Sequence, residues 1–365
     1  MICMVYAYAA IWMSMRAEKQ AFADIAPAEE LSLAQSSAVV FVYHRIGEDR
    51  FQESNLPFEQ FEEHVQAMTL EDYNVLPMAD MLYAIKEGQT LPERSIVITF
   101  EGAYKPTLDA ALPLLIAHKI PFTIFLSPER VDWQSDKYLS WAELKKLKKK
   151  HKKLISFGLI PGKYDHLAED HMETYSHMVN YGLGRFREEL DIKPAYITYP
   201  YGEFTADIQM RVKEYEFDAA FGQQSGVVYE GSDFYALPRF SMTSSFGGLD
   251  RFQLTAGSKA LPVVLENPYQ SLIQDLPEDA DIRFSVKKNI PNLDKISCFA
   301  SSIGKIEVAR DGQNIALHIP KTWLADKLRV NCTLPYVTHD HNDATATETV
   351  REQWYWLGML FHPMI

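Results

Sequence analysis

The sequence predicts an α/β protein, built as a (β/α)7–8 barrel that is followed by an antiparallel β-sandwich. Between residues 38 and about 240, short runs rich in Val, Ile, Phe and Tyr alternate with helical segments. Such continuous apolar runs are typical of parallel strands that are buried on both faces. After about residue 264, further runs follow at short spacing with no convincing helix between most of them, which favours an antiparallel sandwich.

The composition is that of a folded globular protein. The 365 residues are 47% hydrophobic and 23% charged, which excludes disordered, collagen-like and coiled-coil chains. The formal net charge of −13 argues against binding of nucleic acid or anionic membranes, because phosphate binding needs a positive surface. No internal apolar run reaches the roughly 18 residues that a membrane-spanning helix needs.

The amino-terminal segment, residues 1–35, is set apart from the folded domains. Residues 1–13 are almost entirely apolar, and Arg16 and an Ala-Phe-Ala triplet at 21–23 follow them. We interpret this segment as an export signal or a disordered tail. The first interpretation predicts a periplasmic or secreted protein with no membrane span beyond the signal itself.

The remaining chain divides into two predicted domains. We expect the barrel over residues 36–260 and the sandwich over residues 278–365, with a proline-containing connector at 261–277. The barrel strands are expected at 38–44, 74–77, 95–100, 121–127, 154–159, 195–200, 218–222 and 237–240. The sandwich strands are expected at 282–286, 296–300, 305–309, 314–319, 329–334 and 354–361.

Helix-start signals stand between the barrel strands. Asn55 is expected to cap a helix that carries Phe58, and Ser140 with Glu143 forms a predicted capping box. The helix after Ser140 ends in a run of lysines over 145–153, which we interpret as a solvated face rather than an anion-binding patch. An open doubly wound sheet is less favoured than a barrel, because no Gly-rich phosphate loop follows the first strand.

Two of the three cysteines, Cys298 and Cys332, fall on separate predicted strands of the sandwich. In an exported protein a disulfide between them is plausible, whereas in a reducing compartment both would remain buried thiols. The sequence leaves these two alternatives open.

Three predicted strands end in residues that could carry chemistry, and in a barrel the working residues come from the carboxyl ends of the strands. The third strand ends in Thr-Phe-Glu-Gly-Ala-Tyr at 99–104, the fifth is followed by residues 158–167, and the sixth ends in Tyr-Pro-Tyr-Gly-Glu at 199–203. A candidate site is therefore expected where these ends meet.

The order and spacing of these motifs resemble the polysaccharide deacetylases of the NodB-homology type, carbohydrate esterase family 4. The similar segments are 42–45, 99–104, 199–202, 237–240, 331–335 and 354–359. The resemblance implies a role in carbohydrate metabolism as a hydrolase of the C–N amide bond in N-acetylated amino-sugar polymers. It also implies a divalent metal such as zinc, held by one Asp and two His, and an Asp that acts as general base.

The chain departs from that pattern at the positions that would hold the metal. Aligned with the family motifs, Glu101 stands at the position of the general base, and Gly102 at that of the Asp ligand. Ile160 and Tyr164 stand at the positions of the two His ligands. A catalytic zinc site uses about three protein ligands, so we expect no metal and no other cofactor, and a catalytically degenerate family member.

Seven residues remain candidates for the site. Glu101 and His166 are the candidate catalytic residues, as a base and acid pair without a metal. Aromatic faces suit the C–H patches of sugar rings, and the predicted substrate-binding residues are Tyr104, Tyr164, Tyr199, Pro200 and Tyr201.

Three functions follow from this interpretation. The leading one is a deacetylase-like protein that binds an N-acetylated glycan or a partner protein without turnover. The second is an active metal-dependent N-deacetylase with a remodelled site. The third is a structural or assembly subunit.

Overall fold

A computed structural model describes the protein over residues 36–163, 166, 171–266, 269–273, 281–287, 290–319, 327–339 and 350–363. The predicted signal segment and Tyr164 lie outside the described residues. Within them, no helix combines the length and the apolar character that crossing a bilayer would require.

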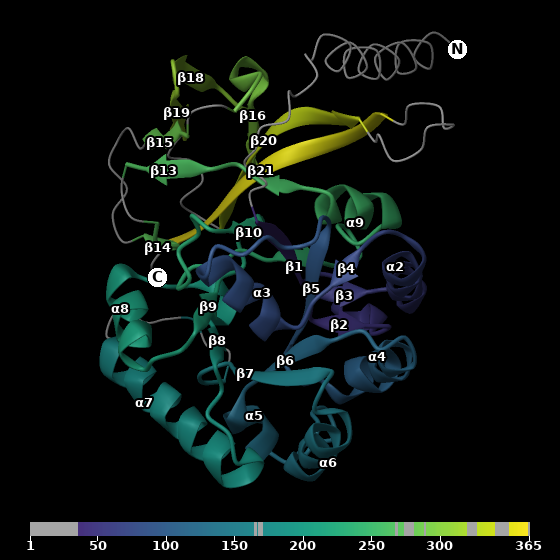
Figure 1. The fold of residues 1–365 in the computed structure, drawn as a ribbon. Helices are drawn as coiled ribbons and strands as arrows, with labels where there is room; N and C mark the ends of the chain where they lie inside the picture. The colour runs from purple at the N-terminus through teal and green to yellow at the C-terminus, as the bar shows by residue number, and fades with distance from the viewer. Residues whose placement is uncertain are drawn as a thin grey trace, which may run out of the picture.

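The first part of the chain forms a curled, mainly parallel sheet in the order β10-β1-β5-β6-β7-β8-β9, with β4 beside β5 and β11 beside β1 (Figure 1). Only β10 runs antiparallel, against β1. An isolated β-bridge between Phe221 of β9 and Leu237 links β9 to the segment before β11. This bridge narrows the gap between the β9 edge and the β11 edge of the curled sheet. The strands are β1 (Ser37–Tyr43), β4 (Asn74–Val75), β5 (Ser95–Glu101), β6 (Phe122–Leu126), β7 (Ile155–Leu159), β8 (Tyr196–Thr198), β9 (Ala219–Phe221), β10 (Val227–Tyr229) and β11 (Phe240–Met242).

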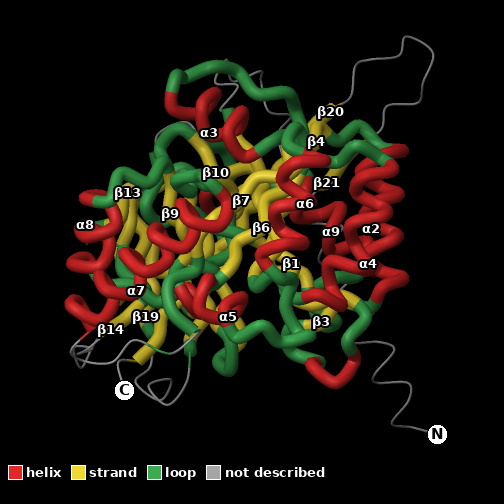
Figure 2. The backbone as a smooth tube through the Cα atoms, turned by 90° about the horizontal axis from the view of Figure 1, so that it is seen from below, coloured by secondary structure: helices red, strands yellow, loops and turns green. Residues whose placement is uncertain are grey.

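Helices surround this sheet (Figure 2). Their bounds are α2 (Phe58–Leu70), α3 (Met78–Lys86), α4 (Lys105–Ala117), α5 (Pro128–Asp132), α6 (Trp141–His151), α7 (His171–Arg185), α8 (Ala206–Glu214) and α9 (Leu249–Ala256). Short helical turns are η1 (Asp49–Phe51), η2 (Phe186–Leu190), η3 (Pro200–Gly202) and η4 (Leu293–Lys295).

Two sequence predictions about helix starts have different outcomes. The capping box at Ser140 is confirmed, because its hydroxyl accepts from the Glu143 amide while the Glu143 carboxylate accepts from the Ser140 amide. The prediction that Asn55 caps α2 is wrong. Asn55 lies in the two-residue strand β3 (Asn55–Leu56), which pairs with β2 (Arg45–Ile46), and its side chain accepts from the Glu48 amide.

Both faces of the curled sheet are buried, as the apolar runs predict. In β1, Val39 and Phe41 pack with the surrounding helices in the largest core cluster. Ala38 and Val40 point to the opposite face and join a second cluster inside the curl, which also contains Phe125. Alternate residues of one strand therefore serve two cores, and the strand has no polar face.

The carboxyl-terminal part forms two further sheets, shown green to yellow in Figure 1. One has the order β12-β21-β20-β16-β17 with β14 beside β21, and the other has the order β13-β15-β19-β18. Pairing is antiparallel except that β12 and β14 run parallel to β21. The strands are β12 (Lys259–Ala260), β13 (Val263–Leu265), β14 (Leu272–Ile273), β15 (Asp281–Val286), β16 (Ser297–Ala300), β17 (Gly304–Ile306), β18 (Val308–Asp311), β19 (Asn314–His318), β20 (Leu328–His339) and β21 (Val350–Pro363).

The structure differs from the sequence prediction at the connector. Residues 263–265 and 272–273 of that segment are strands β13 and β14 rather than a plain linker. Two- and three-residue strands give too short a pattern to be recognised from sequence alone. The connector therefore contributes one strand to each carboxyl-terminal sheet.

Cys298 of β16 and Cys332 of β20 lie directly opposite each other across the sheet and form a disulfide. Both residues are fully buried in the core between the two carboxyl-terminal sheets. Of the two alternatives that the sequence left open, the structure has the bridged pair.

Candidate functional site

The candidate site lies at the carboxyl edge of the curled sheet. Glu101 is the last residue of β5, Ile160 directly follows β7, and η3 follows β8. Because these strands are parallel neighbours, their carboxyl ends meet at one edge, as expected for the working end of a barrel. We call this edge the barrel mouth.

Glu101 is buried at the barrel mouth, with only 1% of its surface exposed. Its Oε2 accepts from Nη2 of Arg239 at 2.5 Å, and Oε1 accepts from Nε2 of Gln223 at 3.1 Å. The Arg239 side chain is also fully buried and donates through Nε to the Gly222 carbonyl. These donors, one on each oxygen, fix the orientation of the buried Glu101 carboxylate.

His44 and the carboxyl-terminal sheets complete this network. His44 Nε2 lies 3.8 Å from Oε1 of Glu101, and burial lowers the pKa of His44 despite the nearby carboxylate. Arg329 of β20 donates to the Gln223 carbonyl at 2.9 Å. The carboxyl-terminal sheets therefore support the loop that holds Glu101.

Two of the positions that would hold the family's metal carry no donor. Gly102 has a φ of +106°, and a Cβ built there would lie 2.4 Å from the Tyr104 ring. Ile160 is fully buried among apolar side chains inside the curl, together with Phe125 and Phe221. A carboxylate at residue 102 would meet strain, and an imidazole at residue 160 would meet a packed core.

The residues present therefore do not fit a divalent metal of the family type. Across the part of the chain that the structure describes, no group of three or more His, Cys, Asp or Glu side chains is arranged to hold a metal ion. The donor set of a catalytic zinc site, three protein ligands and an open position, is not met by the described residues.

A second polar cluster at the barrel mouth centres on Glu203. His166 Nδ1 lies 2.6 Å from Oε1 of Glu203, and His362 Nδ1 lies 3.4 Å from the same oxygen. Glu203 is 3% exposed, whereas the His166 side chain is 62% exposed. The carboxylate thus orients an imidazole that stays open to solvent, and His362 reaches it from the end of β21.

His362 differs from His166 in its surroundings. It is buried, and its Nε2 has no hydrogen-bond partner among the described residues. Burial lowers the pKa of His362 to about 4, although the neighbouring Glu203 carboxylate opposes this shift. His362 is therefore neutral at physiological pH.

The two predicted catalytic residues have different hydrogen-bond partners in the structure. Glu101 is bound to Arg239, and His166 is bound to Glu203. These contacts give each residue a partner other than the one that the sequence analysis assigned to it, and the base and acid pair of Glu101 and His166 stays a prediction. His166 remains accessible, whereas Glu101 does not.

The five predicted substrate-binding residues differ in their exposure. Tyr201 is 37% exposed and stacks on the His166 ring with centroids 4.2 Å apart, and Tyr104 is half-buried beneath the Arg45 guanidinium. Tyr199 does not face the mouth, which corrects its assignment as a binding residue: it is fully buried, and its hydroxyl donates to the Tyr235 carbonyl. Pro200 is buried and shapes the turn, while Tyr164 lies outside the described residues.

Four residues of the mouth, Gln223, Arg239, Glu203 and His362, were not predicted from sequence. Arg239 and Glu203 each stand inside or next to a motif of the family resemblance, which is a signal that could have found them. Gln223 and His362 carry no such signal, since they reach the site only through the folding of the loop after β9 and of β21.

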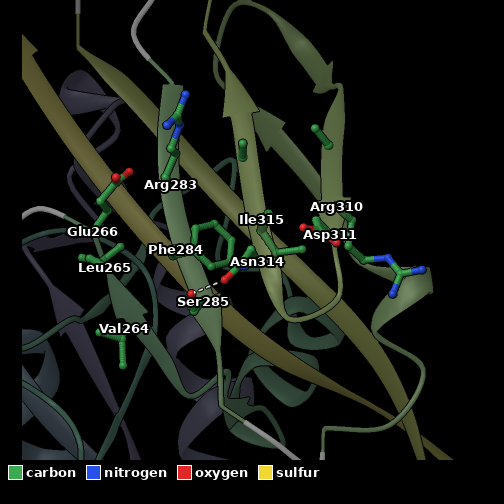
Figure 3. A pocket seen from close by; sticks show the side chains of 12 residues that line it. Val264, Leu265, Glu266, Arg283, Phe284, Ser285, Arg310, Asp311, Asn314 and Ile315 are labelled. Atoms are coloured by element: carbon green, nitrogen blue, oxygen red, sulfur yellow. Dashed lines mark hydrogen bonds between the residues drawn. The ribbon is translucent and has the colours of Figure 1, made fainter.

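Two further hollows are lined by described residues other than those of the Glu101 and Glu203 clusters. One has a volume of about 560 Å³ and lies on the sheet of β13, β15, β18 and β19, where Arg283, Ser285 and Asn314 are among the residues that line it (Figure 3). The hydroxyl of Ser285 donates to the Asn314 side chain there, at 2.6 Å. The other, of about 500 Å³, lies between α5, the segment after β7 and α7.

Comparison with known proteins relates part of the curled domain to a known family. Residues 88–220 match the family model described as polysaccharide deacetylase. The chain is 24% identical over 243 residues to the poly-beta-1,6-N-acetyl-D-glucosamine N-deacetylase of Staphylococcus aureus strain MRSA252, covering 60% of this chain and 82% of the relative. The chain therefore contains a polysaccharide-deacetylase domain and is homologous to these N-deacetylases.

Solved structures share the fold. The deacetylase PplD of Streptococcus pyogenes, in complex with acetate, superposes with a TM-score of 0.55 at 14% identity, over 61% of this chain and 99% of that chain. IcaB from Ammonifex degensii superposes with a TM-score of 0.51 at 20% identity, over 61% of this chain and 98% of that chain. The predicted NodB-type fold is thereby confirmed.

Proposed function

We propose that this protein binds an N-acetylated amino-sugar polymer at the barrel mouth and does not hydrolyse it by the metal-dependent mechanism of its family. The absence of metal-dependent hydrolysis is inferred from Ile160. This residue is fully buried in an apolar cluster at the position where the family has a His ligand. Gly102 supports it, since that position has no side chain to bind an ion.

The ligand class is supported by the relatives and by the exposed groups of the mouth. The relatives are named for poly-beta-1,6-N-acetyl-D-glucosamine. The stacked rings of Tyr201 and His166 give the mouth an exposed flat surface, and aromatic faces pack well on the apolar side of a sugar ring. We place the protein outside the cytoplasm, in agreement with its Cys298–Cys332 disulfide and its apolar amino-terminal segment.

The test has two measurements on the purified full-length protein. Elemental analysis is expected to find zinc well below one equivalent. Calorimetric titration with β-1,6-linked N-acetylglucosamine oligomers is expected to show binding without release of acetate. One equivalent of zinc together with acetate release would overturn the proposal, and so would the absence of binding at millimolar oligomer.

A second function, an N-deacetylase with a remodelled site, is favoured by one observation. The bond from His166 Nδ1 to the buried Glu203 carboxylate fixes the imidazole, which leaves Nε2 to act on a proton. Acetate release by the metal-free protein that disappears in a His166→Gln variant would support this function instead of the first.

A further inference from the structure

The second hollow described above, between α5 and α7, is separate from the residues of the barrel mouth. We call it the α5–α7 hollow. Its floor and walls include Trp133, Gly162, Lys163, Met178 and Tyr181. Its volume of about 500 Å³ falls in the range of small-molecule sites. Gly162 belongs to the same segment after β7 that leads to His166, so the hollow borders the mouth along the chain.

Two aromatic rings stand open in this hollow. Trp133 is 52% exposed and Tyr181 is 39% exposed. Single exposed aromatics are ordinary, but two that line one hollow beside charged groups are typical of a binding site. Large rings that lie open to solvent can bury their faces against a ligand.

The Tyr181 ring is held in place before any ligand arrives. Its hydroxyl donates to Oδ2 of Asp132 at 2.6 Å. Asp132 in turn accepts from Nε1 of Trp141 at 2.7 Å and from Nη2 of Arg185 at 2.8 Å. These bonds hold the pKa of Asp132 below its usual value even though burial opposes that shift. A ring fixed in this way loses little conformational entropy on binding.

The hydroxyl of Ser127 gives the hollow a rigid base. It donates to the Gly162 carbonyl at 2.6 Å, and so ties the end of β6 to the segment after β7. Glu129 also lines the hollow, and burial raises the pKa of its carboxyl group. This carboxyl can exchange hydrogen bonds with sugar hydroxyl or amide groups.

The charges around Trp133 select among sugars. The guanidinium carbon of Arg130 lies 5.3 Å from the Trp133 ring centroid, and Nζ of Lys163 lies 5.8 Å from it. An ammonium group on a deacetylated sugar beside Trp133 would be repelled by these two cations, whereas a neutral N-acetyl group would not. Of the two carboxylates that line the hollow, those of Glu129 and Asp132, the latter is already paired with Arg185.

We propose that the α5–α7 hollow is a second saccharide subsite, which takes a neutral N-acetylhexosamine residue of the same polymer that occupies the barrel mouth. This inference rests on the proposed function, because it needs a polymer bound at the mouth. The polymer would place one sugar beside Tyr201 and another against Trp133.

The test compares short and long oligomers on three forms of the full-length protein by calorimetry. Trp133→Ala is expected to weaken binding of the N-acetylglucosamine hexasaccharide roughly tenfold and that of the disaccharide less than about twofold. Trp133→Phe is expected to keep most of the affinity for the hexasaccharide. Tyr83→Ala, a matched control at a 59% exposed ring on α3, is expected to bind as the wild type does.

The outcomes separate the two proposals. If the wild type binds the hexasaccharide and Trp133→Ala binds it equally well, the subsite is refuted while the proposed function stands. If Trp133→Ala weakens both oligomers equally, the hollow is not a separate subsite. If the wild type binds neither oligomer, the proposed function fails and the subsite with it. Equal or tighter binding of the fully deacetylated hexasaccharide would refute the preference for a neutral sugar. Thermal unfolding of each variant checks that the exposed substitutions leave the fold intact.

Discussion

The two buried glutamates of the barrel mouth have different partners. Glu101 faces the Arg239 guanidinium, which stays charged at every physiological pH. Glu203 faces two imidazoles, those of His166 and His362. Two equally buried carboxylates can therefore differ in role. An arginine partner keeps its charge across the physiological pH range, whereas a histidine partner can gain or lose a proton within it.

The two sides of the mouth also differ in access. Arg239 is buried, and so are Glu101, Gly102 and Ile160. On the other side, His166 and Tyr201 lie open to solvent. The two described positions that align with metal ligands of the family, Gly102 and Ile160, are therefore buried, whereas His166 and Tyr201 are exposed.

The largest expected effect is loss of the Glu101–Arg239 pair. Glu101→Ala should lower the free energy of unfolding by about 4 kcal/mol, since it leaves a buried guanidinium without its counter-ion. The double variant Glu101→Met with Arg239→Met should recover much of this loss. Urea unfolding measures both. A loss below about 1 kcal/mol in the single variant would show that the Glu101–Arg239 pair contributes little to stability.

The next effect concerns the buried ligand position. Ile160→His should destabilise the protein by about 3 kcal/mol, since it removes buried apolar surface and brings a polar ring into the core. Ile160→Val, the control, should cost about 1 kcal/mol. Unfolding in the presence and absence of zinc checks the interpretation. Full recovery of the histidine variant by zinc would mean that the mouth can still assemble a metal site.

The third prediction concerns the pH dependence of stability that His362 of the Glu203 cluster produces. The folded-state pKa of His362 is about 4, below the unfolded value near 6.5, so between these values the unfolded chain binds the extra proton. The stability that His362 contributes is thus present above pH 6.5 and is lost as the pH falls toward 4.

The measurement is urea unfolding at pH 7.5 and pH 5. The wild type should lose about 2 kcal/mol more than His362→Gln does over this interval. His118→Gln, at an exposed position, should keep the wild-type pH dependence. The same loss in all three proteins would place the acid sensitivity outside the Glu203 cluster.

The smallest effect is on ligand affinity alone. Tyr201 has a φ of +55°, so Tyr201→Gly relieves backbone strain while it removes the exposed ring. Stability should change by less than about 1 kcal/mol, and binding of N-acetylglucosamine oligomers should weaken roughly tenfold. Unaltered affinity in calorimetric titration would remove Tyr201 from the binding surface.

Much of the fold was predictable because its signals are local. The apolar runs of β1 and β5 and the capping box at Ser140 each depend on a few consecutive residues. Asn55 misled the prediction because an Asn before an apolar run can cap a helix or enter a strand, and its neighbours in space decide which. Strands β12 to β14 were missed because two or three residues show no period.

The candidate site was only partly predictable. The strand ends located the mouth, and the missing donors at Gly102 and Ile160 are visible in the sequence. The pairing of Glu101 with Arg239 joins residues 138 positions apart, and that of Glu203 with His362 joins the end of η3 to the end of β21. No local pattern encodes such pairs.

The sequence by itself determined the parallel strands, the place of the mouth and the side chains that stand at its ligand positions, because strand periodicity and residue identity are local properties. Only the tertiary structure decided which buried carboxylate pairs with an arginine and which pairs with histidines. Burial and the choice of a charged partner depend on chain segments that meet after folding, and these two factors set the energy of a carboxylate in a protein interior.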